Sequence, residues 1–123
     1  MILDHCRDKK ELYELYKNRP MDDGIFDFDF IANNPHLYCF YDEDKGYLKG
    51  YANIYEDEQG RLYLSGASIR KNMSENINAI IKLCKAYKKN VYAETDKKEA
   101  IYCLIKAGFK KIKENLYMRC KNG

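Results

Sequence analysis

The sequence has few of the residues that mark common metal, redox and nucleotide sites. Its two histidines, His5 and His36, lie far apart, and its five cysteines include no C-x-x-C pair. This spacing disfavours a zinc site or a disulfide framework, so we expect no metal and reduced, buried thiols. The chain also contains no P-loop, no dinucleotide-binding fingerprint and no H-E-x-x-H pattern. No local motif therefore predicts a metal site, a disulfide framework or a nucleotide-binding loop.

Long apolar runs and strong charge are also absent. No apolar run approaches membrane-spanning length, and the first residues lack the apolar core of a signal peptide. We therefore expect a cytoplasmic protein with no membrane partner. The 22 basic and 19 acidic residues leave a net charge of only +3, which disfavours nucleic acid as a partner. The basic residues nevertheless gather between Lys82 and Lys121.

The chain is rich in short periodic segments. Apolar and aromatic patterns predict strands over residues 1–6, 36–44, 45–60, 61–69, 90–96, 109–112 and 116–121. Helical spacing predicts helices over residues 7–20 and 74–87, and a third that ends at Gly108. Residues 21–35 fit a loop, a short helix or a strand. With no linker or repeat in 123 residues, this order predicts one α+β domain over residues 1–123.

Two helix starts carry capping residues. Ser74 is the expected N-cap of the second helix, because its hydroxyl can accept a hydrogen bond from a backbone N–H of the first turn. Asp96 with Glu99 three residues later resembles a capping box, with Asp in the Ser/Thr role. These two signals place the helix starts at residues 74 and 96.

The segment AIYCLIKAGFKKI (residues 100–112) resembles the GNAT superfamily of acyl-CoA-dependent N-acyltransferases. The family signature is roughly A-x-x-x-Y-x-x-x-G-F after a strand, and Ala100, Gly108 and Phe109 match its ends. GYLKGYANIY is similar to the family's third strand, and the resemblance covers the chain from about Pro35 onward. It implies a GNAT-like three-layer α/β/α fold whose central mixed, splayed sheet has about six to seven strands.

The resemblance also implies a reaction and a cofactor site. The family transfers an acetyl or other acyl group from acyl-CoA to an amine of a small molecule or a protein, and a homodimer is compatible with it. Its pantetheine arm lies between two parting strands, here residues 61–69 and 90–96, and its pyrophosphate lies on the following helix start. The implied cofactor-binding residues are Gly66, Ala67, Ser68, Ile69, Lys71, Asn72, Ser74, Glu75 and Asn76.

The expected phosphate turn departs from the family pattern. The family has R/Q-x-x-G-x-G/A there, whereas SIRKNMSENINAI (residues 68–80) contains no glycine. Placing Lys71 first puts Ser74 and Asn76 at the glycine positions. Placing Asn72 first puts Glu75 at the first of them, where its carboxylate would repel phosphates. We therefore expect acetyl-CoA or another acyl-CoA to bind more weakly than in the family.

The expected proton donor is also missing. Four residues before Gly108 the family often has a tyrosine that protonates the departing thiolate, but this chain has Leu104. Tyr102 lies about 200° away around the helix, so it points elsewhere. The resemblance implies that the backbone N–H groups near residues 66–68 would stabilise the tetrahedral oxyanion.

Two other side chains are catalytic candidates. Glu94 is a candidate general base that would remove a proton from the acceptor ammonium, although a strand Glu is also often solvent-facing. Tyr51, with Tyr55 and Tyr63, would line an acceptor pocket, although sheet tyrosines are also common packing residues.

Three functional hypotheses follow. The first is a GNAT-like acyltransferase. The second is a non-catalytic GNAT-fold binding or accessory protein, of the kind that a phage or mobile element would encode, which has lost CoA-dependent activity. The third is nucleic-acid binding through the lysine-rich C-terminal half, which salt-dependent retention on DNA or RNA would reveal.

Overall fold

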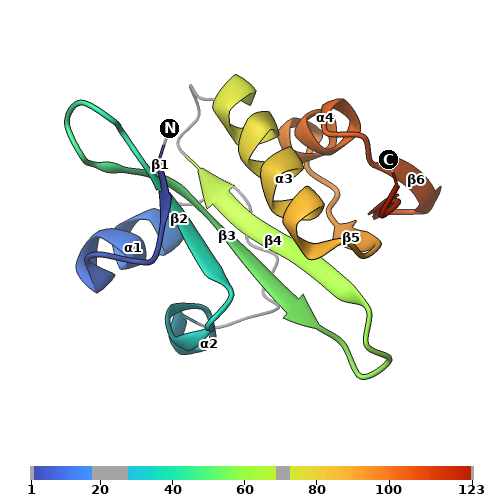
Figure 1. The fold of residues 1–123 in the computed structure, drawn as a ribbon, viewed down its shortest axis with the longest axis horizontal. Coiled ribbons are helices and arrows are strands. Elements are labelled where there is room, and N and C mark those ends of the chain that lie inside the picture. Colours follow the sequence, from blue (N-terminus) through green and yellow to red (C-terminus); the bar gives the residue numbers. More distant parts are fainter. Residues whose placement is uncertain (1, 18–27, 69–72, 123) are drawn as a thin grey trace. The chain divides into compact units, whose positions relative to one another are not determined.

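The computed structural model describes residues 2–17, 28–68 and 73–122, and its elements follow the expected order (Figure 1). Residues 28–33, within the segment that the sequence left open, form a short helix. The elements are β1 (Ile2–Asp4), α1 (Lys9–Lys17), α2 (Phe28–Asn33), β2 (Leu37–Tyr41), β3 (Leu48–Glu56), β4 (Leu62–Ser68), α3 (Met73–Tyr87), β5 (Val91–Glu94), α4 (Lys98–Lys106), β6 (Lys110–Lys113) and β7 (Leu116–Arg119).

All seven strands belong to one sheet, in the order β1-β2-β3-β4-β5-β7-β6. β4 and β5 are parallel, whereas β1–β2, β2–β3, β5–β7 and β6–β7 are antiparallel. A parallel pair needs a long crossover connection, and α3 supplies it. The sheet is therefore mixed, and the predicted α+β fold class with a mixed sheet is confirmed.

The chain divides into two compact units. Unit 1 comprises Met1–Asn53 and Gly66–Asn72, and unit 2 comprises Ile54–Ser65 and Met73–Gly123. β3 and β4 contribute residues to both units. The single domain expected over residues 1–123 stays a prediction.

The core of unit 1 is built where α1, α2, β2 and β3 bring apolar side chains together. Its buried members are Leu12, Ile31, Leu37, Cys39, Tyr41, Leu48 and Tyr51. The phenol oxygen of Tyr41 accepts a hydrogen bond from the Arg7 backbone N–H at 2.8 Å. Burial raises the pKa of Tyr41 to about 12, because a buried phenolate loses its hydration.

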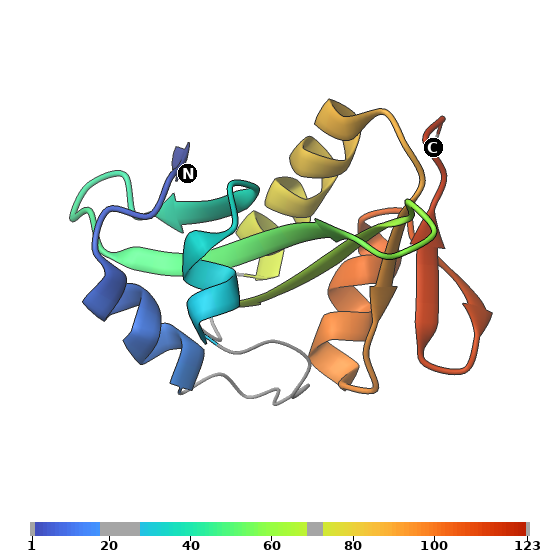
Figure 2. The same cartoon turned by 90° about the horizontal axis from the view of Figure 1, so that it is seen from below.

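Unit 2 packs both of its helices on one face of its part of the sheet (Figure 2). Val91 and Ala93 are buried on β5, whereas Tyr92 and Glu94, which alternate with them, are half-buried and exposed. Arg119 is the register partner of Val91 and therefore lies on the same face. Its Nε donates to the Ala107 carbonyl after α4 at 3.0 Å.

Burial raises the pKa of the Cys84 thiol of α3, and the nearby positive charge of Arg119 partly offsets this rise. Both helices therefore lie on the face of Val91 and Arg119. Tyr92 is on the opposite face.

The two ends of α4 show where local sequence signals succeed and fail. Lys97 is the N-cap and its side chain makes no capping bond, so the predicted capping box of Asp96 and Glu99 is wrong. The helix begins at Lys98, two residues after Asp96, which places Asp96 before the cap. The C-terminal prediction is confirmed, because Gly108 adopts φ +97° after the last turn, a conformation that glycine reaches without strain.

Candidate cofactor-binding site

Gly66, Ala67 and Ser68 form the half-buried end of β4. A Cβ atom on Gly66 would collide with the Tyr51 carbonyl oxygen of β3. A Cβ atom on Gly50 would likewise collide with the Phe40 ring. Gly66 therefore allows the backbones of β3 and β4 to approach closely, and Gly50 leaves room for the Phe40 ring. Gly66 thus has a packing role that is independent of any cofactor.

The pairing of β4 with β5 ends early. Among the described residues, the register pairs are Leu62 with Val91 and Tyr63 with Tyr92. β5 continues through Ala93 and Glu94, which pair with β7, and β4 continues to Ser68. The two parallel strands thus stop pairing before either of them ends, as expected of the splayed sheet that the GNAT resemblance implies.

The first turn of α3 carries the next group of expected cofactor residues. The helix begins at Met73, so Ser74 lies in the first turn rather than at the cap position expected for it. Ser74 is exposed, Glu75 is half-buried, and the Oδ1 oxygen of Asn76 is buried. The N–H groups of a first turn carry partial positive charge, which favours anions in general and the Glu75 carboxylate in particular. Glu75 thus stabilises the helix but competes with a bound phosphate.

The remaining predicted cofactor residues, Ile69, Lys71 and Asn72, lie outside the described residues. The two catalytic candidates differ in burial. Glu94 is exposed at the end of β5, whereas Tyr51 is only 3% exposed within the core of unit 1. This burial favours the packing alternative for Tyr51, and the catalytic role of either residue stays a prediction.

The side chains of α4 lie as its helical spacing predicts. Leu104 is buried at 5% exposure, and Tyr102 is 48% exposed on another side of the helix. The position of the family's proton donor is therefore filled by an apolar side chain that is part of the core. Tyr102 is not a substitute for it.

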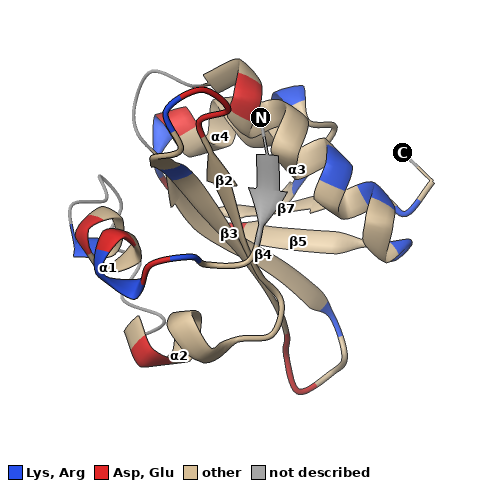
Figure 3. Ribbon diagram, turned by 60° about the vertical axis from the view of Figure 1, so that its left-hand side comes forward, with Lys and Arg blue, Asp and Glu red and all other residues tan. Residues whose placement is uncertain are grey.

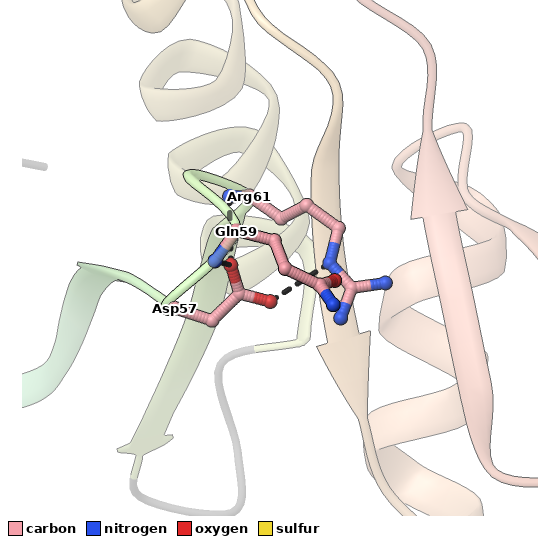
Figure 4. A network of polar contacts seen from close by, with 3 residues as sticks. All are labelled: Asp57, Gln59 and Arg61. Atoms are coloured by element: carbon pink, nitrogen blue, oxygen red, sulfur yellow. Dashed lines mark hydrogen bonds and ion pairs between the residues drawn. The ribbon is translucent and has the colours of Figure 1, made fainter.

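Sequence reasoning missed a polar network at the turn between β3 and β4 (Figure 4). The Asp57 carboxylate accepts the backbone N–H groups of Gln59 and Arg61 at 2.9 Å each, and the Arg61 Nε at 2.7 Å. Partial desolvation raises the pKa of Asp57, but these bonds outweigh it and hold the pKa below its ordinary value. The bond to Asp57 in turn raises the pKa of Arg61. The opposite charges at positions 57 and 61, across a turn signal, were the available clue.

The described part of the chain contains neither a candidate metal site nor a candidate membrane-spanning helix. Those residues contain no group of three or more His, Cys, Asp or Glu side chains placed to hold a metal ion. No helix among them is both long and apolar enough to cross a membrane.

Comparison with known proteins assigns the fold. No protein-family model and no curated protein sequence matches the chain, but several solved structures do. A variant of the spermidine N-acetyltransferase SpeG from Vibrio cholerae matches with a TM-score of 0.72 and 11% identity, over 99% of this chain and 96% of that one. A GNAT-family acetyltransferase from Bacillus anthracis matches with a TM-score of 0.67 and 12% identity, over the whole of both chains.

GCN5 of Tetrahymena matches with a TM-score of 0.66 and 12% identity, over 98% of this chain and 96% of that one. At these identities the likeness concerns the backbone rather than the chemistry of the site. This likeness agrees with the element order and the mixed sheet of the chain. The chain has the GNAT fold.

Proposed function

We propose that the protein is an acyl-CoA-dependent N-acyltransferase that transfers an acetyl or other acyl group to an amine. The early end of the β4–β5 pairing, at Tyr63 and Tyr92, carries the proposal. The GNAT fold supports it, because SpeG and other proteins of this fold are acetyltransferases. SpeG is named for the amine spermidine, which supports an amine acceptor here without identifying it.

Each segment of the site has a distinct role in this proposal. The backbone of Gly66, Ala67 and Ser68, with Ile69, holds the pantetheine arm, and its N–H groups stabilise negative charge on the acyl oxygen. The first turn of α3, with Lys71 and Asn72 before it, binds the phosphates. Bound acyl-CoA supplies the thioester carbon that the amine attacks.

The acid–base chemistry rests on few side chains. Glu94, exposed at the end of β5, takes the proton of the acceptor ammonium, because only the neutral amine has a lone pair for attack. Leu104 cannot protonate the departing thiolate. The thiolate therefore leaves unaided or takes a proton from water, and catalysis depends mainly on positioning.

The fit of the site to the cofactor is incomplete. The start of α3 retains its backbone N–H groups and its partial positive charge. It lacks the glycines that would let phosphates approach the backbone closely, and it carries Glu75 in the first turn. We therefore expect binding that is weak and sensitive to charge at this helix start.

The proposal is tested by calorimetric titration of acetyl-CoA into the parent protein, Ser74→Glu and Asn78→Glu. Both variants add one negative charge to an exposed position of α3, but Asn78 lies one turn beyond the first turn. Micromolar binding that Ser74→Glu abolishes and Asn78→Glu retains supports the proposed site. Equal loss in both variants would place the phosphates elsewhere.

A non-catalytic binding or accessory protein is the second candidate. Leu104 favours it, because the position of the family's proton donor belongs to the apolar core of unit 2. If neither heat nor a thermal shift is seen at millimolar acetyl-CoA, this candidate replaces the enzyme.

A further inference from the structure

A row of large side chains crosses the face of the unit 2 sheet opposite its helices. The register aligns Tyr63 of β4 with Tyr92 of β5, Tyr92 with Met118 of β7, and Met118 with Lys110 of β6. Tyr55 of β3 extends the row, because its ring stacks on that of Tyr63. These five residues are called the tyrosine face. It spans five strands, β3, β4, β5, β7 and β6.

The rings of Tyr55, Tyr63 and Tyr92 stack one on the next at equal spacing. The Tyr55 and Tyr63 centroids are 5.5 Å apart with the ring planes at 17°, and the Tyr63 and Tyr92 centroids are 5.5 Å apart with the planes at 29°. The central Tyr63 is only 6% exposed, whereas Tyr55, Tyr92 and Met118 are half-buried. A ligand would therefore contact the outer members of the row, with Tyr63 as their support.

Arg61 adds a fixed positive charge to this row. Its guanidinium carbon lies 5.8 Å from the Tyr63 centroid and 5.5 Å from the Tyr92 centroid. Asp57 holds the Nε edge, and Figure 4 shows the far edge of the guanidinium pointing away from Asp57. The side chain is 42% exposed. Because the Arg61 side chain is already positioned, a phosphate that binds its outer edge orders little further.

The charge of unit 2 is complementary to a polyanion. The unit carries 13 basic and 8 acidic residues, a net charge of +5, whereas unit 1 has a net charge of −2. Figure 3 shows basic positions on α3, which are Lys82 and Lys85 on the helix-covered side of the sheet. Lys110, Lys111 and Lys113 are exposed on β6. Near the turn, Glu56 pairs with Lys89, and Asp57 pairs with Arg61. The overall charge of +3 hides this division.

We propose that the tyrosine face, together with Arg61, binds single-stranded nucleic acid. Base stacking on sheet aromatics combined with phosphate contacts to basic side chains is a recurrent way to hold unpaired strands. The outer surfaces of Tyr92 and Met118 receive bases, and Arg61 and Lys110 receive phosphates. Arg61 and the members of the tyrosine face are not among the residues proposed to bind acyl-CoA, although Glu94 lies on the same face of β5 as Tyr92. The nucleic-acid proposal therefore does not depend on acyl-CoA binding.

The nature of the surface favours an unpaired strand over a duplex. Bases within a duplex are stacked on each other and cannot lie on a sheet surface, whereas those of a single strand can. Positive charge alone would bind duplex and single strands alike. The aromatic row therefore predicts a preference for single strands over duplexes, which positive charge alone does not predict.

The test measures fluorescence anisotropy of a labelled single-stranded homopyrimidine DNA of about 12 nucleotides, which is within the range of known binding sites. The expected result is binding that weakens as salt rises from about 50 to 200 mM. An unlabelled duplex of the same length should compete poorly. The absence of binding at the lower salt, or equal competition by the duplex, would overturn the proposal.

Matched variants assign the binding to the surface. Tyr92→Leu removes the ring and should weaken binding about tenfold, whereas Tyr92→Phe keeps the ring and should bind as the parent does. Arg61→Gln should reduce the slope of log affinity against log salt by about one. Lys9→Gln makes the same charge change at an exposed position of α1 in unit 1, and should leave affinity within about twofold of the parent.

Two outcomes contradict this assignment. Equal losses in Arg61→Gln and Lys9→Gln would show that binding is non-specific. Light scattering that shows a dimer, abolished by Tyr92→Leu and formed without any binding of DNA, would assign the surface to a second copy of the chain. Circular dichroism of each variant confirms that it is folded, and the exposed Arg61 position keeps the test valid if Tyr92→Leu does not fold.

Discussion

The end of α4 and the start of α3 lie in the same unit, and the GNAT pattern concerns both. At the end of α4, Gly108 and Phe109 match the pattern. The Phe109 N–H donates to the Leu104 carbonyl at 2.9 Å, and the Gly108 N–H donates to the Ile105 carbonyl at 3.1 Å. These two bonds form a Schellman motif. At the start of α3, the chain has no glycine where the family places two.

The difference separates what folding requires from what a cofactor requires. The turn after α4 needs a residue with positive φ, and Phe109, 2% exposed, fills the core next to it. Any change there costs folding free energy. The start of α3 needs only residues that tolerate the first turn of a helix, and Ser74 and Glu75 do so. The part of the pattern that this chain retains is therefore the part that its fold needs.

The largest expected effect tests the packing at the end of α4. Phe109→Ala should lower the free energy of unfolding by about 3–5 kcal/mol, because it leaves a cavity in the core. Ile112→Ala, at a position that is 47% exposed, should change it by about 0.5 kcal/mol or less. Urea denaturation measures both. Similar values for the two variants would show that Phe109 is not a core residue.

The second effect tests whether α3 is packed as firmly as α4. Burial raises the pKa of the Cys84 thiol from 9.0 to about 11. The unfolded chain therefore loses this proton at lower pH than the folded chain does. This difference contributes fully to the free energy of unfolding below pH 9. As the pH rises from 9 toward 11, the free energy of unfolding falls by about 2–3 kcal/mol.

Guanidinium unfolding of the reduced protein at pH 8 and pH 11 measures this change. Cys84→Ala should reduce the loss of stability between these two pH values, whereas Cys120→Ala, at an exposed position, should not. If Cys84→Ala leaves the pH dependence unchanged, the middle of α3 is more open to water than its burial indicates.

A smaller effect tests the glycine itself. Gly108→Ala should cost about 1–2 kcal/mol, because an L-residue is strained at φ +97°. A Cβ atom there would lie 3.4 Å from the Arg119 Nε, an ordinary contact, so the cost is one of backbone conformation. Gly108→Asn should cost less, because Asn tolerates this region better. Thermal unfolding ranks the variants, and an Asn variant less stable than the Ala variant would contradict this explanation.

The smallest effect concerns the start of α3. Glu75→Gln should tighten acetyl-CoA binding about two- to fivefold at low salt, because it removes a negative charge from the proposed phosphate site. Glu99→Gln makes the same change in the first turn of α4 and should have no effect. Calorimetry measures both. Equal affinities for the parent and Glu75→Gln would remove the repulsion argument.

Local signals were sufficient for most of the fold. Apolar periodicity predicted the strands and the three longer helices, and Gly108 marked the end of α4, because each of these features depends on neighbours within a few residues. The capping box at Asp96 failed because it requires the exact residue at which the helix begins, and local sequence specifies that residue only to within one or two positions. The nine cofactor residues came from the resemblance, and their role stays a prediction.

The sequence by itself determined the order of the elements, the glycine that ends α4 and a net charge of +3. Only the tertiary structure decided which side chains share a surface. Tyr55, Tyr63 and Tyr92 meet because the strand register aligns them on one face, and Arg61 reaches two of them because Asp57 holds it there. The reason is that register and face depend on pairing between distant segments, and a shift by one residue would turn every side chain of a strand to the other face.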